Sequence, residues 1–139
     1  MEGKLERRDS LSWKDKSWVI GVSYGLFAKA YDWNDLQNSR VINDNIEQFP
    51  LLILLENDSA SFHVWSRIVA ADTLSFSLSE NNETFIDINS GSVWDWSGRC
   101  TEGAWKGATL NTVQSYQEYW HSWRTFHPDS ERYLPAENK

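Results

Sequence analysis

The sequence has a single cysteine, three prolines and seven glycines among its 139 residues. One cysteine excludes an internal disulfide framework. The low content of glycine and proline excludes a collagen-like or low-complexity chain. Hydrophobic residues at 40% and charged residues at 24% do not fit intrinsic disorder. A chain of this length and composition is expected to form one ordinary globular domain.

Positive charge and long apolar runs are also scarce. Lysine and arginine number 13 against 20 aspartates and glutamates, which gives a net charge of −7. Binding to phosphates requires a basic face, so neither nucleic acid nor an anionic membrane surface is an expected partner. The longest apolar run is Pro50–Leu55, far shorter than the roughly 20 residues that span a bilayer. We therefore expect no membrane insertion.

The start of the sequence lacks a secretory signal, because residues 1–16 are highly charged and contain no apolar core segment. Two alternatives follow: the protein stays inside the cell, or the chain is a piece of a larger exported protein. We expect residues 1–16 to be a charged linker or N-terminal extension, residues 17–134 to form a single globular domain, and residues 135–139 to be a frayed tail.

Aromatic residues are plentiful, with nine tryptophans, five tyrosines and six phenylalanines. They must supply much of the buried area of a chain this size. Two of the tryptophans lie one residue apart in the stretch GSVWDWSGRC, Gly91–Cys100. Residues 93–96 are predicted to form a short strand in which Trp94 and Trp96 share one face and Asp95 lies on the other.

Most of the chain has the pattern of short β-strands. Tyr24-Gly25 separates two β-type runs at the spacing of a two-residue hairpin, and Asp32 can cap a short helix over residues 33–36. Leu51–Leu55 has no polar alternation, as expected of a central strand covered on both faces. The expected strands are residues 18–23, 26–31, 51–55, 61–66, 72–78, 84–88 and 93–96.

The C-terminal part has a helical pattern instead. Ser115 and Glu118 match the S-x-x-E capping box, and Pro128 ends the helix. One helix face carries Tyr116, Trp120, Trp123 and His127. The predicted fold class is therefore α+β, mainly β: about eight short, mostly antiparallel strands in a curled sheet or open barrel. The C-terminal helix packs on it through Tyr116, Trp120 and Trp123.

The candidate site residues are weakly specified. Carboxylates that could serve as an acid and a base are Asp32, Asp35, Asp44, Asp95 and Glu102, but no spacing selects a pair. Exposed Trp94, Trp96 or Trp105 could stack on sugar rings, whereas the alternative is that they are core aromatics. His63, His121 and His127 lack metal-ligand spacing, and Cys100 is expected to be a small buried hydrophobe. The sequence predicts no catalytic residue, metal site or cofactor.

Five segments in order resemble a bacterial family, the domain of unknown function 3179. Together they cover residues 18–133, and they are Val19–Val22 with Gly25 and Ala28–Tyr31, Val41–Asp44, Ser90–Trp94, the glycines Gly98, Gly103 and Gly107, and Trp123–Asp129. The resemblance implies that GSVWDWSGRC is a structural signature of the family. It also implies a cell-envelope location if the chain is a fragment of an exported protein.

The sequence departs from the family pattern at one chemically important place. The family usually carries a Cys-x-x-Cys after the proline of its central strand, and counting from Pro50 those positions are Glu56 and Ser59. Neither residue can supply a thiolate for a metal or a redox partner. The resemblance therefore implies a divergent member that lacks the family cysteines.

Three functions are compatible with these residues. The first is a non-catalytic accessory or ligand-binding module for a small molecule or a protein, and the rest of a longer parent chain is one such partner. Its candidate ligand-binding residues are Trp94, Asp95, Trp96, Asp44 and Glu102. The second is a hydrolase that uses cleft carboxylates beside Trp94 and Trp96. The third is a protein-interaction scaffold, which predicts several exposed and contiguous tryptophans.

Overall fold

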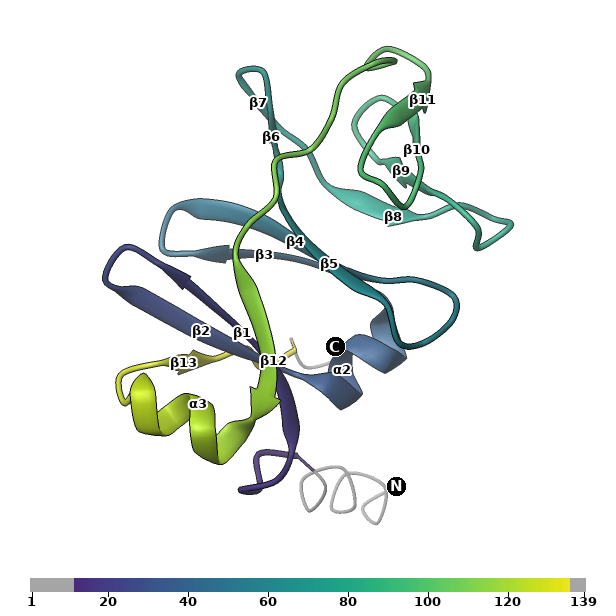
Figure 1. The fold of residues 1–139 in the computed structure, drawn as a ribbon. Helices are drawn as coiled ribbons and strands as arrows, with labels where there is room; N and C mark the ends of the chain where they lie inside the picture. The colour runs from purple at the N-terminus through teal and green to yellow at the C-terminus, as the bar shows by residue number, and fades with distance from the viewer. Residues whose placement is uncertain (1–11, 136–139) are drawn as a thin grey trace. The chain divides into compact units, whose positions relative to one another are not determined.

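The computed structural model describes residues 12–135 and contains thirteen strands and two helices in that range (Figure 1). The elements in chain order are β1 (Trp18–Tyr24), β2 (Phe27–Asp32), α2 (Trp33–Ser39), β3 (Val41–Ile46), β4 (Phe49–Leu55), β5 (Phe62–Ser66), β6 (Ile68–Val69), β7 (Asp72–Thr73), β8 (Phe76–Leu78), β9 (Phe85–Asp87), β10 (Val93–Trp94), β11 (Cys100–Glu102), β12 (Ser115–Tyr119), α3 (Trp120–Phe126) and β13 (Glu131–Arg132). The mainly β, α+β class is confirmed. The strands outnumber the expected eight because several are only two or three residues long.

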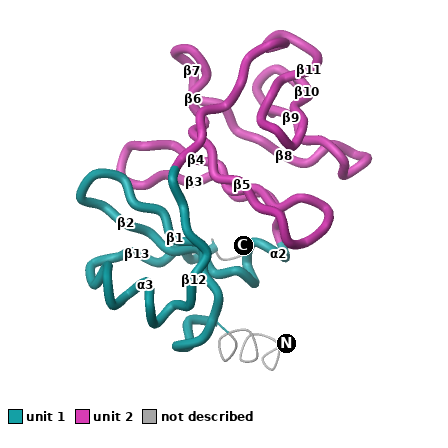
Figure 2. The backbone as a smooth tube through the Cα atoms, in the orientation of Figure 1, with its two compact units in different colours: residues 1–38, 114–139 teal, residues 39–113 magenta. Residues whose placement is uncertain are grey.

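The chain divides into two compact units (Figure 2). Unit 1 consists of residues 1–38 and 114–139, and unit 2 is the continuous segment 39–113. The described strands form four sheets rather than one curled sheet. That residues 17–134 behave as a single domain stays a prediction. Within residues 12–135, neither helix has the length and apolar character needed to cross a membrane.

Unit 1 is built on the sheet β12-β1-β2-β13. Strands β1 and β2 form the predicted hairpin, and Gly25 in its turn has a φ of 61°, a conformation that costs glycine little. Helix α3 packs through Trp120 and Trp123 on Val19 and Ala30. A Cβ atom at Gly21 would overlap the Trp123 ring. Glycine at position 21 therefore lets the indole lie directly on the strand backbone.

The prediction of a helix from Ser115 onward is wrong for its first five residues. Residues 115–119 form strand β12, which pairs antiparallel with β1 from Val22↔Ser115 to Trp18↔Tyr119. A strand at the sheet edge satisfies its main-chain groups through the ladder, and this outweighs a local capping motif. Tyr116 is accordingly 46% exposed on a strand and not on the helix. Trp120 and Trp123 are buried, as expected.

Residues before β1 supply hydrogen-bond acceptors for the first N–H groups of helix α3. The main-chain N–H groups of Trp120 and His121 donate to the carbonyls of Ser17 and Asp15, at 2.8 and 3.0 Å. These bonds satisfy helix amides that have no partner within the helix. Trp13 packs edge-on against Trp120, with ring centroids 4.9 Å apart. Residues 12–16 of the expected linker thus contact unit 1, whereas residues 1–11 and 136–139 lie outside the described range.

Helix α2 follows Asp32 as predicted, but it extends to Ser39. The Asp32 side chain is buried, and its Oδ2 accepts a 2.8 Å hydrogen bond from the hydroxyl of Ser12. Asp32 therefore ties the segment before β1 to the start of α2.

Unit 2 begins with the three-stranded sheet β3-β4-β5. Strand β4 is central, and residues 50–55 are all buried, which confirms the prediction for this apolar run. The side chain of Asn43 on β3 bridges to β8, where its Nδ2 donates to the Phe76 carbonyl and its Oδ1 accepts from the Phe76 N–H, at 2.9 and 2.8 Å. This pair of bonds replaces a stretch of strand ladder between the two sheets.

The other sheet of unit 2 has the order β11-β10-β9-β8, and β6 and β7 form a separate hairpin. The expected single strand over residues 72–78 is split into β7 and β8. The split occurs because the N–H of Leu74 bonds to the Arg67 carbonyl and the N–H of Ser75 bonds to Asn89 Oδ1. Leu74 and Phe76 are both buried, as their period-two pattern predicted.

The core of unit 2 is rich in stacked aromatic rings. Trp65 stacks on Phe85 at 5.7 Å between centroids, and Phe76 meets Phe85 and Trp94 edge-on at 5.6 and 5.7 Å. Aromatic pairs in these geometries add to the burial of their area. The loops of unit 2 extend from this aromatic core.

Candidate functional site

The stretch GSVWDWSGRC belongs to a buried polar network centred on Asp87. The indole nitrogen of Trp94 donates to Asp87 Oδ2 at 3.0 Å, and the main-chain N–H and hydroxyl of Ser90 donate to Oδ1 at 2.6 and 2.7 Å. Asp87 and Trp94 are both 0% exposed. A buried carboxylate needs several donors, and these three supply them. Trp94 and Ser92 of this stretch therefore belong to the interior of unit 2.

Ser92 extends this network to the loop after β11. Its hydroxyl lies 2.7 Å from that of Ser90 and accepts a 3.3 Å hydrogen bond from the Trp105 N–H. Gly103 has a φ of 105°, and a Cβ atom there would lie 2.5 Å from Ser92 Oγ. Only glycine combines this backbone conformation with so close an approach. The loop 103–107 is thereby fixed against the turn 88–92.

A pocket of about 510 Å³ lies beside this network, within unit 2. It is formed by three separate segments and is lined by Asp72, Thr73, Leu74, Asn89, Ser90, Ala104 and Trp105. Its volume falls in the range of small-molecule sites. Leu74 is buried, Trp105 is half-buried, and Asp72, Thr73, Asn89 and Ser90 are exposed. The pocket thus combines one aromatic ring with several hydrogen-bonding side chains.

Each wall of the pocket is held by hydrogen bonds behind it. Arg67 is buried and donates to the carbonyls of Leu74 and Leu51, both at 2.9 Å. Asn89 Oδ1 accepts from the Ser75 N–H, and the N–H of Ala108 donates to the Trp105 carbonyl at 2.8 Å. Because each of the three segments is held by at least one such hydrogen bond, the pocket is preformed.

The structure brings together only some of the candidate ligand-binding residues predicted from the sequence. Trp94, Asp95, Trp96 and Glu102 lie in the β10–β11 hairpin, whereas Asp44 lies in β3 of the other sheet. Trp94 is fully buried, so its ring is part of the core and has no face available to a ligand. Trp96 is half-buried and stacks on Phe85 at 5.8 Å between centroids. None of these residues lines the pocket.

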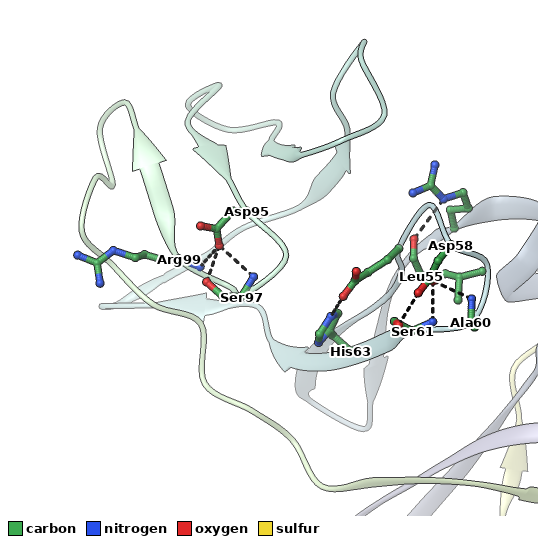
Figure 3. Close-up of polar contacts among 10 residues, drawn as sticks. Leu55, Asp58, Ala60, Ser61, His63, Asp95, Ser97 and Arg99 are labelled. Atoms are coloured by element: carbon green, nitrogen blue, oxygen red, sulfur yellow. Dashed lines mark hydrogen bonds and ion pairs between the residues drawn. The ribbon is translucent and has the colours of Figure 1, made fainter.

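The carboxylate of Asp95 organises its own turn (Figure 3). Its Oδ1 accepts from the N–H and hydroxyl of Ser97, at 2.9 and 2.5 Å, and from the N–H of Arg99 at 3.3 Å. Partial burial raises the pKa of Asp95, but these bonds outweigh it and hold the pKa below its ordinary value. An acid catalyst needs the opposite shift.

Glu56 and Ser59 lie in the turn between β4 and β5. The Glu56 carboxylate is 2.6 Å from Nε2 of His63, and the His63 ring stacks on Trp65 with centroids 4.6 Å apart. Ser59 has a φ of 63°, and its N–H donates to the Glu56 carbonyl at 3.0 Å. The turn is therefore closed by a carboxylate, an imidazole and main-chain bonds.

Asp58 stabilises the same turn (Figure 3). It accepts from the hydroxyl and N–H of Ser61, at 2.6 and 2.8 Å, and from the N–H of Ala60 at 2.9 Å. These bonds lower the pKa of Asp58 to about 2. Its carboxylate is committed to the turn and is ionised at neutral pH.

Cys100 is 1% exposed and belongs to the aromatic core of unit 2. Burial raises the pKa of its thiol, and the nearby Asp87 charge adds to this effect. The prediction of a small buried hydrophobe is confirmed. Among the described residues, no three His, Cys, Asp or Glu side chains are grouped closely enough to hold a metal ion.

Of the pocket residues, sequence reasoning had marked only Trp105. Asp72 begins one of the predicted strands, and Asn89 and Ser90 lie between two others. The available signal was the run Asn89-Ser90-Gly91 close to the glycines at 98, 103 and 107. Such a run indicates tight loops, which are common sites of binding residues. It does not reveal which loops meet.

Comparison with known proteins identifies one family. A family model described as Protein of unknown function (DUF3179) matches residues 4–130. No curated protein and no solved structure matches the chain.

Proposed function

Because the chain belongs to the DUF3179 family, whose description assigns no activity, we propose from its own residues that it is a non-catalytic ligand-binding module. Its binding site is the pocket beside Trp105. The observation that carries this proposal is the pocket itself, whose lining residues are Trp105, which also packs against the core of unit 2, and residues with an acidic, an amide and two hydroxyl side chains. Small-molecule sites commonly pair an apolar surface with a few convergent polar groups.

The absence of activated groups supports a non-catalytic role. The resemblance to the family implies that Glu56 and Ser59 stand where other members carry cysteines, and the Cys100 thiol is buried with a raised pKa. The carboxylates of Asp58 and Asp95 are bonded within their own turns with lowered pKa values. A nucleophile or general acid requires the reverse of these arrangements.

The hydrolase alternative receives less support. It needs Asp44, Asp95 and Glu102 to converge beside exposed Trp94 and Trp96. The Trp94 ring is fully buried, and Asp44 belongs to a different sheet from the other two carboxylates.

The scaffold alternative requires several exposed tryptophans in one patch. All nine lie in the described range, and only Trp18 is largely exposed, at 45%. It stacks on Tyr119, which is 43% exposed, with ring centroids 4.4 Å apart. One stacked pair is a small surface for a stable protein interface, so the pocket remains the better candidate.

The proposal can be tested by titrating the ¹⁵N-labelled protein with a panel of polar metabolites, including sugars, amines, amino acids and nucleosides. We expect a saturable change at the amides of residues 72–74, 89–90 and 104–105 and at the Trp105 indole. Changes confined to other residues, or no saturable change with any compound, would contradict the pocket as the binding site.

A further inference from the structure

Resting on the proposed function of the pocket, we propose that its ligand is a neutral pyranose sugar that stacks on Trp105. The lining residues restrict the ligand by charge, by hydrogen-bonding capacity and by shape. Asp72 contributes to the first two restrictions, and Trp105 supplies the third. Together they select an uncharged, polyhydroxylated ring.

Charge excludes anionic ligands. Among the described residues that line the pocket, Asp72 is the only charged one, and none is lysine, arginine or histidine. Phosphate and carboxylate ligands need cationic partners or several converging main-chain N–H groups. Beside the Asp72 carboxylate they would be repelled.

Hydrogen-bonding capacity favours a ligand with several hydroxyl groups. The Asp72 carboxylate supplies acceptors, and the Thr73 hydroxyl can both donate and accept. Asn89 uses its Oδ1 to accept from the Ser75 N–H, which leaves its amide nitrogen as a donor. Donors and acceptors on adjacent side chains match vicinal hydroxyls, each of which also donates and accepts.

The ring of Trp105 supplies the apolar part of the site. One face of a pyranose presents C–H bonds with a slight positive charge, and the face of an indole is negative. Trp105 is half-buried, and its main chain is bonded on both sides, to Ser92 Oγ through its N–H and to the Ala108 N–H through its carbonyl.

The buried network behind the pocket reduces the cost of binding. Ser90 lines the pocket and also donates to Asp87, and Ser92 joins the same network to Trp105. Loops that are ordered before the ligand arrives lose little conformational freedom on binding. The family signature Ser90–Trp94 therefore frames the sugar site without contacting the sugar through its tryptophan.

The test uses ligands that share a ring and differ in charge. The ¹⁵N-labelled chain is titrated with methyl glucoside, methyl galactoside and methyl mannoside, and separately with glucuronate and glucosamine. We expect at least one neutral glycoside to perturb the Trp105 indole and residues 72–74 and 89–90 saturably. Glucuronate should bind roughly tenfold more weakly or not at all. A neutral oligosaccharide is titrated in the same way. If it binds more tightly than the methyl glycosides, the ligand is a glycan chain rather than a free sugar.

Two variants and two controls locate the sugar. Trp105→Ala and Asp72→Ala should each weaken neutral glycoside binding roughly tenfold. The controls Trp18→Ala and Asp129→Ala remove the same two types of side chain from exposed positions of unit 1. They should leave glycoside binding unchanged. Asp72 is exposed, so its variant remains informative even if Trp105→Ala fails to fold.

The outcomes separate the two proposals. If amines, nucleosides or glucosamine alone bind at the pocket and neutral glycosides do not, the sugar proposal is overturned and the ligand-binding module stands. If no compound perturbs the pocket, both proposals fail. Glycoside binding that survives both Trp105→Ala and Asp72→Ala also overturns the sugar proposal.

Discussion

The indole N–H of Trp94 donates a 3.0 Å hydrogen bond to Asp87 Oδ2, and neither residue is exposed to solvent. This bond links the tryptophan of the family signature to the carboxylate that also holds Ser90. A buried charge and a buried N–H each pay a large desolvation cost when unpaired. The pair is therefore a fixed point of unit 2, from which the pocket loops extend.

Asp87→Ala is expected to lower the free energy of unfolding by roughly 3 kcal/mol, because it leaves the donors of Trp94 and Ser90 without a buried acceptor. Urea denaturation followed by tryptophan fluorescence measures the change. Asp129→Ala, at an exposed position, should shift the free energy by less than about 0.5 kcal/mol. Equal effects of the two substitutions would show that the network contributes little.

Gly103→Ala should destabilise the protein more than Gly107→Ala, although the two glycines lie in one loop and have similar φ angles of 105° and 93°. Both substitutions impose backbone strain of roughly 1 kcal/mol. A Cβ atom at position 103 also meets Ser92, whereas one at position 107 meets nothing within 4 Å. We expect Gly103→Ala to cost at least about 1 kcal/mol more. Thermal unfolding of the two variants compares them directly, and equal losses would argue against the close contact with Ser92.

Cys100 should be unreactive in the folded protein. Its thiol is buried, and that burial raises its pKa, so little thiolate forms near neutral pH. Labelling with iodoacetamide at pH 8, followed by mass spectrometry, should give little modification in buffer and complete modification in denaturant. Rapid stoichiometric labelling of the native chain would contradict the burial of the Cys100 thiol.

Asp58 should titrate near pH 2 in the folded protein. Since its pKa is lowered from 3.8, the associated stability is present above pH 3.8 and is lost as the pH falls toward 2. Ser61→Ala removes the largest cause of the shift and should raise the pKa toward 3.8. Carboxyl ¹³C chemical shifts against pH measure both values. An unshifted pKa in the unsubstituted chain would mean that the turn bonds do not persist in solution.

Local patterns predicted those parts of the fold that local physics determines. The β1–β2 hairpin followed from the spacing around Gly25, and the buried β4 followed from its unbroken apolar run. The error at Ser115 has the opposite cause. The pairing partner of β12 is β1, which lies at the other end of the sequence, and no local motif reports a partner that distant.

The pocket was missed for the same reason. Asp72, Asn89 and Trp105 come from three loops, and each is unremarkable among its own neighbours. What brings their loops together is hydrogen bonding by Arg67, Asp87 and Ser92, which are buried polar residues. A polar residue in a sequence is ordinarily read as exposed, so the frame of the site was the part least accessible to sequence reasoning.

Unit 1 is formed by two segments that are separated in the sequence by unit 2, and this has a consequence for folding during synthesis on the ribosome. Strand β1 is made early, but its partner β12 is made only after the whole of residues 39–113. Unit 2 is one continuous segment, so its sheets are complete before β12 emerges. Domains generally fold in the order in which they are made. Unit 2 is thus positioned to fold first, while the nascent β1–β2 hairpin awaits its edge strand.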